Sequence, residues 1–466
     1  MNARTECTRR TAARYSPTPL GAHLARAIAL IALLALPAAA QDSMAPDSAA
    51  DNPSAPKATA RAIPPPIEIA FYRAHDARGI NVFEAPKEER VPYTGFKIQW
   101  GAAFTQQFQA LDHENTADTT IATNRLMTIG SGFNNAEANL YLDAQIARGI
   151  RVALETYLSS RHHPETWVKD GYLLIDDSPW ENELLDHLME HLTLRLGHFE
   201  INYGDMHFRR TDNGEAMFNP LVGNLLMDAF TTEIGGEVYV RASSLLGMVA
   251  VTGGEVRGNV LKPEQRSLAF IGKLGFDRAM SDMLRVRLTG SLYTTSKSIS
   301  NTLYSGSRAG SRYYYVLENT TATEAAQAWS GDVQPGFRRK VTAWVINPFV
   351  KVQGLELFGN IERAKGQSLG ETSDRKWSQY AGEAVYRLFH NQIFLAGRYN
   401  VAKGKLVGIT PEVTVNRVQV GGGWFLTPNM VAKGEYVRQE YDDFPVTDIR
   451  SGGMFHGVMV EAVVSF

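Results

Sequence analysis

A short stretch of the chain combines residue types that steer ions. Between residues 204 and 228, two adjacent arginines stand among three acidic residues: Arg209, Arg210, Asp205, Asp212 and Glu215. Guanidinium groups attract anions, and carboxylates beside them weaken that field. If this stretch lines a passage, the mixture predicts a mild preference for anions.

A second pair of arginines has the spacing of a basic ladder. Arg285 and Arg287 lie two residues apart, so they share one face if the segment is a β-strand. They are the best candidates for a basic wall across from the first group.

Motifs for catalysis or metal binding are scarce. His162-His163 and His187-x-x-x-His191 have metal-like spacing, but the second pair lacks the Glu after the first His that a zinc-protease helix needs. There is no Gly-x-Ser-x-Gly motif and no glycine-rich phosphate loop before a helix. We therefore expect no enzyme activity, no metal site and no cofactor.

Residues 1–40 have the features of a secretory signal peptide. Five arginines precede the apolar run Ala27 to Leu36, and the small residues Ala38-Ala39-Ala40 follow it. The run is too short to cross a bilayer as a helix, which takes about 20 residues. The one cysteine, Cys7, lies in this segment, so the exported chain has no thiol or disulfide.

The charge balance excludes nucleic acid as a partner. After removal of residues 1–40, 42 basic and 48 acidic residues give a net charge of −6. Nucleic-acid-binding proteins carry basic patches instead.

The segment 41–93 precedes the main domain. Residues 41–66 are rich in Ala, Pro, Ser and Asp, which predicts a flexible leader. Residues 67–93 contain short apolar runs and form either an ordered periplasmic segment or a small plug.

From residue 94 to the end, segments of 10–15 residues alternate between apolar and polar side chains. Strands of this length with one uniformly apolar face suit a bilayer, which a tilted strand crosses in about 9–11 residues. The pattern predicts an all-β protein, a transmembrane antiparallel β-barrel of about 16 strands over 94–466. The predicted strands are 94–109, 133–147, 150–160, 167–177, 191–203, 229–242, 245–254, 266–279, 282–296, 340–352, 354–364, 377–389, 392–404, 414–426, 429–441 and 454–466.

The lengths of the links support a barrel. Most even-numbered strands are followed by turns of two or three residues or fewer, whereas strands 1, 5, 9 and 15 are followed by long loops. Outer-membrane barrels show this asymmetry, with short periplasmic turns and long extracellular loops. One periplasmic link, 178–188, has the pattern of a short capped helix instead.

The chain ends in a strand with an apolar face and a terminal aromatic residue, Phe466. This strand resembles the closing strand of Gram-negative outer-membrane barrels. In that family the terminal Phe belongs to the signal read by the barrel-assembly machinery. The resemblance implies the outer membrane of a diderm bacterium, with membrane lipid and that machinery as partners.

The polar face of each strand gives the expected lumen lining. With the apolar sets facing lipid, nine bases and eight acids face inward, so the lumen holds water and its charges pair with one another. The arginines we expect to line the pore are Arg151, Arg195, Arg285, Arg287, Arg398 and Arg417.

One strand narrows the family. The sequence L-R-L-G-H-F at Leu194–Phe199, after a short helical link, resembles strand five of the phosphate-selective porin O and P family. The resemblance is strongest over 167–245 and extends over 94–466. It implies a homotrimeric 16-stranded porin whose third extracellular loop, here 204–228, folds inward and carries the pore constriction. Family members that select phosphate have several basic residues there, and only Arg209-Arg210 match in this chain.

We therefore interpret the sequence as an outer-membrane porin for passive diffusion of small hydrophilic solutes or ions. One alternative is a gated barrel transporter with 67–93 as a plug, and another is an outer-membrane barrel enzyme.

Overall fold

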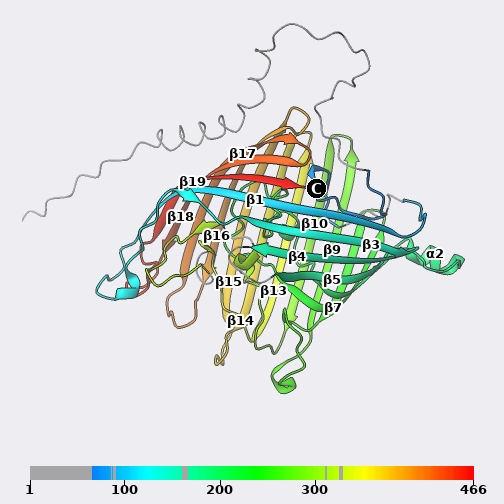
Figure 1. Cartoon of the computed structure of the whole chain (residues 1–466). Coiled ribbons are helices and arrows are strands. Elements are labelled where there is room, and N and C mark those ends of the chain that lie inside the picture. Colours follow the sequence, from blue (N-terminus) through cyan, green and yellow to red (C-terminus); the bar gives the residue numbers. More distant parts are fainter. Residues whose placement is uncertain (1–65, 85–86, 88–90, 160–165, 310–311, 325–328) are drawn as a thin grey trace, which may run out of the picture. The chain divides into compact units, whose positions relative to one another are not determined.

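The computed structural model describes residues 66–84, 87, 91–159, 166–309, 312–324 and 329–466. In this part of the chain, sixteen long strands and one short strand form a single antiparallel sheet whose first and last long strands pair with each other. The sheet is therefore a closed barrel (Figure 1). The predicted fold class, a transmembrane antiparallel β-barrel with sixteen strands, is confirmed.

Every predicted strand has a counterpart in the barrel wall. The largest difference is in the first strand, which continues to Glu114. The wall strands are β1 (Lys97–Glu114), β3 (Glu137–Ala147), β4 (Ile150–Ser159), β5 (Trp167–Ile175), β6 (Leu192–Glu200), β7 (Thr232–Ala242), β8 (Leu245–Thr252), β9 (Ala269–Ser281), β10 (Leu284–Thr295), β13 (Lys340–Val352), β14 (Leu355–Gln367), β15 (Arg375–Leu388), β16 (Ile393–Gly404), β17 (Val413–Thr427), β18 (Met430–Asp442) and β19 (Met454–Ser465).

Three short strands lie outside the regular wall. The two-residue strand β2 (Gly132–Phe133) pairs with β1. In the long loop after β10, β11 (Tyr313–Tyr314) pairs with β12 (Trp329–Ser330). The loop from 296 to 339 thus contains a small hairpin and no further wall strands among its described residues.

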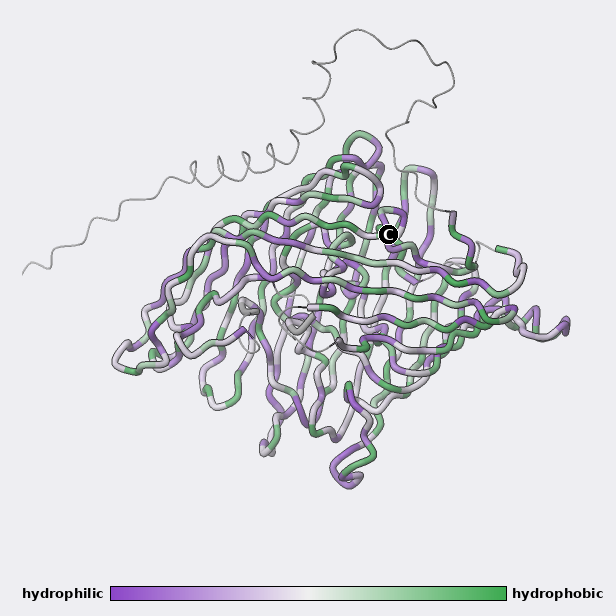
Figure 2. Tube along the Cα trace, viewed as in Figure 1, coloured by the Kyte–Doolittle hydropathy of each residue, from purple (hydrophilic) through white to green (hydrophobic). Residues whose placement is uncertain are grey.

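Alternation along each strand separates two environments. In β16, Leu395 and Tyr399 are more than half exposed, while Arg398 and Asn400 are buried. The tube in Figure 2 shows the same alternation of hydropathy along the wall strands. Because side chains point to opposite faces in turn, the barrel presents an apolar outer surface to lipid and a polar inner surface.

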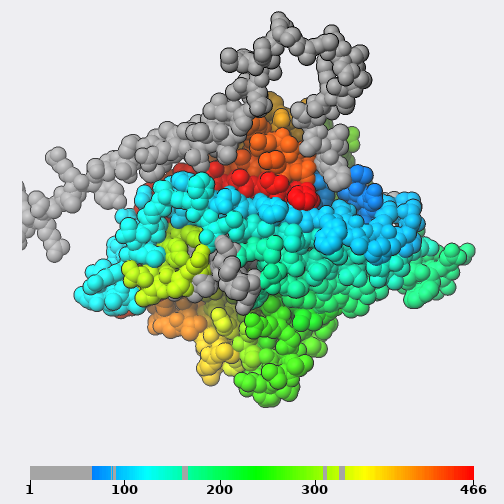
Figure 3. Space-filling view, in the orientation of Figure 1, coloured from blue at the N-terminus to red at the C-terminus, as the bar shows by residue number. Residues whose placement is uncertain are grey.

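The barrel closes between β1 and β19. These strands pair from Ala103↔Ser465 to Glu114↔Met454, and the first half of β1 pairs with β3. The terminal Phe466 extends the ladder, because its N–H donates to Ala102 O at 3.0 Å and its carbonyl accepts from Ala102 N at 2.9 Å. Figure 3 shows the red C-terminal strand directly beside β1.

Short and long links alternate around the barrel. Turns of two residues join β3 to β4, β7 to β8, β9 to β10, β13 to β14 and β17 to β18. Gly149, in the first of these turns, has φ +65°, and a Cβ there would lie 2.1 Å from Asp177 O. The link between β5 and β6 holds the predicted short helix, α2 (Glu183–Met189), whose N-cap Asn182 accepts from Leu185 N at 3.1 Å. In the described part of the chain, no helix is long and apolar enough to cross a membrane.

Closure by the terminal strand generates a prediction. Deleting Val464–Phe466 removes the end of the β1–β19 ladder and should abolish barrel assembly. The readout is the difference in gel mobility between boiled and unboiled protein, which we expect to disappear. Deleting Val260 and Leu261, which are exposed in the loop between β8 and β9, should leave the difference intact. Assembly of the truncated protein at the level of the wild type would contradict the role of this closure.

Candidate functional site

The third long loop fills part of the barrel interior. Residues 204–228, between β6 and β7, are almost all buried, and Thr211, Leu226 and Met227 are fully so. Wall side chains satisfy the loop backbone, because Leu226 N donates to Asn400 Oδ1 at 2.6 Å and Met227 N donates to Gln379 Oε1 at 2.7 Å. The inward-folded third loop, part of the predicted fold class, is confirmed. We call residues 204–228 the third loop.

Asp205 at the start of the third loop binds two bases of the wall. Its carboxylate lies 2.8 Å from Arg287 on β10 and 2.7 Å from Lys273 on β9, and it accepts from the Thr289 hydroxyl at 2.8 Å. Burial raises the pKa of Asp205, but Lys273 and Arg287 outweigh it, and the net pKa lies below its usual value. Asp205 is therefore ionised and fastens the loop to the wall.

Arg209 and Arg210 are both buried and paired with carboxylates. Arg209 lies 2.7 Å from Glu383 on β15, and Arg210 forms two hydrogen bonds to Asp228 at the end of the same loop, one at 2.9 Å and one at 2.5 Å. The Arg209 guanidinium lies over the rings of Phe349 and Phe358. The positive charges of Arg209 and Arg210 are thus largely neutralised inside the barrel.

Asp212 and Glu215 face a group of acids around Lys169. Lys169 Nζ on β5 lies 2.5 Å from Asp212, 3.2 Å from Glu155 and 3.1 Å from Glu200. Glu215 instead accepts from the His75 ring at 3.0 Å, if that nitrogen is protonated. Burial raises the pKa of Asp212 above its usual value, and Lys169 and Arg210 offset this only in part.

The N-terminal segment 66–84 contacts the third loop and the inner wall. Arg73 donates to Phe208 O at 2.9 Å, and the His75 ring stacks on Tyr141 of β3 with centroids 3.5 Å apart. Asn81 donates to Glu356 on β14 at 2.6 Å, and Glu84 lies 2.9 Å from Arg287. Residues 66–84 therefore lie against the inner wall, and a plug formed by 67–93 stays a prediction. We call residues 66–84 the N-terminal segment.

The remaining arginines predicted to line the pore face the interior. Arg151 lies 3.1 Å from Asp143, Arg195 lies 2.5 Å from Glu237, and Arg285 lies 2.7 Å from Asp277. Arg398 binds Glu383 at 2.5 Å, whereas Arg417 donates to Gln439 at 2.6 Å and to loop carbonyls. The predicted pairing of lumen charges is confirmed for these acid–base pairs, and their role in a pore stays a prediction.

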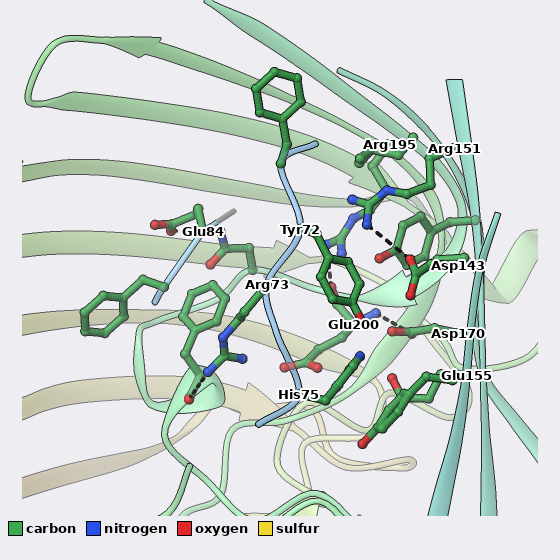
Figure 4. A pocket seen from close by; sticks show the side chains of 18 of the residues that line it. Tyr72, Arg73, His75, Glu84, Asp143, Arg151, Glu155, Asp170, Arg195 and Glu200 are labelled. Atoms are coloured by element: carbon green, nitrogen blue, oxygen red, sulfur yellow. Dashed lines mark hydrogen bonds and ion pairs between the residues drawn. The ribbon is translucent and has the colours of Figure 1, made fainter. Parts of the chain in front are cut away.

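A cavity of about 240 Å³ lies between the N-terminal segment, the third loop and strands β3 to β7. Figure 4 shows Arg151 and Arg195 together at one end, Glu155 and His75 toward the other, and Tyr72 of the N-terminal segment between them. Here the predicted residues Arg151, Arg195, Arg210, Asp212 and Glu215 come together. The other predicted residues lie elsewhere in the interior and do not line it: Asp205, Arg209, Arg285, Arg287, Arg398 and Arg417.

The residues with metal-like spacing form no obvious ligand set. His191 Nδ1 lies 2.9 Å from Arg241 O, its exposed neighbour His187 lies near Glu190, and His162-His163 lie outside the described residues. Glu155, Asp212 and Glu215 bring carboxylate oxygens within 4.8 Å of one another. Because Lys169 Nζ contacts two of these three acids, a lysine supplies positive charge where a cation would bind.

Sequence reasoning missed Lys169, Asp170, His75 and Glu84. With strict alternation, one of the neighbours Lys169 and Asp170 would face outward, yet both are buried. The reason is that the pairing of β4 with β5 shifts its register between Glu155 and Thr156. A β-bulge of this kind breaks the two-residue period. The apolar residues around His75 gave the only signal for the N-terminal segment.

No protein-family model and no curated protein matches the sequence. Several solved barrels are similar in fold. The anion-selective porin from Comamonas acidovorans has 11% identity and a TM-score of 0.47, covering 80% of this chain and 100% of that chain. OmpF of Salmonella typhi in complex with daunomycin has 12% identity and a TM-score of 0.48, covering 80% of this chain and 98% of that chain. The outer-membrane channel DcaP of Acinetobacter baumannii has 7% identity and a TM-score of 0.46, covering 80% of this chain and 99% of that chain. These likenesses are too distant to carry a functional argument.

The closed sixteen-stranded wall and the inward third loop define the class of this protein as a transmembrane β-barrel of the porin type. The predicted membership of the phosphate-selective porin O and P family stays a prediction.

The Asp205 contacts generate a stability prediction. Asp205→Asn removes one of the two carboxylates, Asp205 and Glu84, that Lys273 and Arg287 share. Removing one member of a buried ion pair costs about 3–5 kcal/mol. We expect a clear fall in the temperature at which unboiled protein loses its folded gel mobility. The control Asp374→Asn breaks a partly exposed pair, 3.0 Å from Lys340, and should cost about 0–1 kcal/mol. Equal, small shifts for both variants would contradict the anchoring role of Asp205.

Proposed function

We propose that this protein is an outer-membrane porin through which small hydrophilic solutes and ions diffuse. The observation that carries the proposal is the division of the wall into two faces. Outward residues such as Leu274, Val249 and Leu395 are more than half exposed and apolar, whereas inward residues such as Arg398 and Glu362 are charged and buried among loops. A closed barrel satisfies every strand hydrogen bond in lipid, so it can hold a polar interior within a membrane.

The paired charges support a weak ionic preference. Arg209, Arg210 and Arg287 each lie within 3 Å of a carboxylate, so little net field is left. A mild preference for anions, with Arg209, Arg210, Asp205, Asp212 and Glu215 at the constriction, remains our proposal. We also propose a homotrimeric state, which can be tested by light scattering in detergent. Assembly through Phe466 is a further proposal.

The pairing of Arg209 and Arg210 makes the ionic preference testable. Arg209→Ala/Arg210→Ala removes two positive charges, which frees the carboxylate of Asp228 and leaves Glu383 with Arg398. The reversal potential in a salt gradient should therefore shift toward cations. The shift should shrink as the screening length falls from about 10 Å at 0.1 M to about 3 Å at 1 M salt. The matched control is Arg363→Ala/Arg438→Ala, which removes two arginines exposed on the outer face. An unchanged reversal potential in the first variant would place the loop arginines outside the ion path.

The N-terminal segment favours a second candidate, a gated channel. Its residues contact the third loop at Phe208 and Glu215 and the wall at Glu356, Lys273 and Arg287. The segment is held by these side-chain contacts and by a backbone hydrogen bond from Ala77 N to Pro428 O at 3.0 Å. Because it has no strand of its own in the wall, it can leave the interior without unpairing the sheet. We propose that it narrows the path as a small plug.

Deletion of residues 67–84 tests the plug. We expect faster liposome swelling in small sugars than with the intact protein, because the deletion widens the path through the barrel. Deleting an equally long stretch of the leader, 45–62, should leave the swelling rate unchanged. Equal rates for all three proteins, with folded gel mobility preserved, would exclude a plug function.

A further inference from the structure

The cavity between the N-terminal segment and the wall has two ends of opposite charge. We propose that it binds small zwitterionic solutes, molecules that carry an ammonium and a carboxylate such as amino acids and short peptides. The inference rests on the proposed porin function and names a solute class for it. The cavity of about 240 Å³ is smaller than typical drug-sized sites of about 300–1,000 Å³, so it suits a small ligand.

One end of the cavity, the acidic end, carries more carboxylates than cations. Its acids are Glu155, Asp170, Glu200, Asp212 and Glu215. Lys169 contacts four of these carboxylates, and Glu215 contacts His75. Arg210 lies 3.5 Å from Asp212 but forms its two shorter bonds with Asp228. His207 lies 2.5 Å from Glu200, and the charge of Arg73 acts on Glu215 and Glu200. Five acids against Lys169, Arg73 and Arg210 leave negative charge that an ammonium group would balance.

The opposite end, the basic end, has the reverse imbalance. Its bases are Lys87, Arg151, Arg195 and Arg241, and its acids are Asp143, Asp176 and Glu84, with Glu237 behind Arg195 as its ion partner. Glu84 forms its shorter ion pairs with Arg287 at 2.9 Å and Lys273 at 3.1 Å, outside the cavity, and lies 3.9 Å from Arg241. Burial raises the pKa of Asp176 to about 6, so this acid is half neutral near pH 6. A carboxylate would balance the excess of guanidinium groups.

Each end also has a buried polar atom that bonds to nothing among the described residues. At the basic end this atom is Arg151 Nε, in a side chain more than nine-tenths buried. Near the acidic end it is the Tyr141 hydroxyl, in a residue that is 3% exposed and lines the same cavity. Buried polar atoms usually have partners, so these two atoms mark places where a ligand would complete the bonding. Arg151 Nε–H would donate to a carboxylate, and the Tyr141 hydroxyl oxygen would accept from an ammonium.

The two ends together decide the ligand class. A simple anion would pair with Arg151 but would be repelled by the five acids. A simple cation would pair with the acids but would be repelled by the bases of the basic end. A molecule with both charges gains at each end, and Tyr72 lies between the two ends with its aromatic surface (Figure 4). A charge-assisted hydrogen bond contributes about 1.5–3 kcal/mol, which corresponds to tenfold or more in affinity.

Calorimetric titration of the detergent-solubilised full-length protein at low salt tests the proposal. The probes are glycylglycine as the zwitterion, N-acetylglycine as the anion and glycinamide as the cation. Glycylglycine should bind about tenfold more tightly than either single-charge probe. Glu215→Gln should weaken glycylglycine about tenfold and leave N-acetylglycine within twofold. Arg151→Gln/Asp143→Asn, which removes a pair and keeps the net charge, should weaken glycylglycine and N-acetylglycine alike.

The matched control is Arg375→Gln/Glu371→Gln, an ion pair outside the cavity that should leave all three affinities unchanged. Equal affinities for the three probes with the wild type overturn the proposal without any variant, as does a loss of glycylglycine binding in the control. Because titration needs no ion flow, binding by a protein that does not conduct would refute the porin function and keep the zwitterion site. Conduction without binding would refute the zwitterion site and keep the porin function.

Discussion

The interior of this barrel depends on one constraint, which is that buried charges need partners. The wall alone would expose its inward arginines, lysines and carboxylates to one another across a wide space. The third loop and the N-terminal segment bring Asp205, Asp228 and Glu84 to the bases of the wall and of the loop itself. An unpaired charge in such a place costs several kcal/mol. The pairs therefore fix where both segments lie, and they set how much charge a passing solute meets.

The sequence was sufficient to predict the wall. A strand between lipid and a polar interior must alternate its side chains with a period of two residues, so most wall strands show this alternation in sequence, as in Leu395, Arg398 and Tyr399 of β16. The turns were also predictable, because each turn depends on residues at one place in the chain, such as Gly149 with its positive φ. The inward fold of the third loop was predicted only from a resemblance to a porin family. The residue types of 204–228 alone do not indicate whether the loop folds into the barrel or away from it.

The candidate site was predicted in part because side-chain partners depend on distant residues. Arg209 and Arg210 stood out by type, yet their partners Glu383 and Asp228 follow from the path of the loop. Lys169 was missed because a bulge in β5 breaks the alternation. The place of the N-terminal segment depends on contacts such as His75 with Glu215, which lie 140 positions apart in the chain. Patterns in sequence do not encode such pairings.

The proposed porin would be a weakly selective path, because its interior charges are paired and the third loop and the N-terminal segment fill part of its interior. Single-channel recording in a planar bilayer tests this account most directly. It predicts discrete conductance steps that are small, uniform and larger at higher salt. The absence of steps from protein with folded gel mobility, both intact and without residues 67–84, would contradict it.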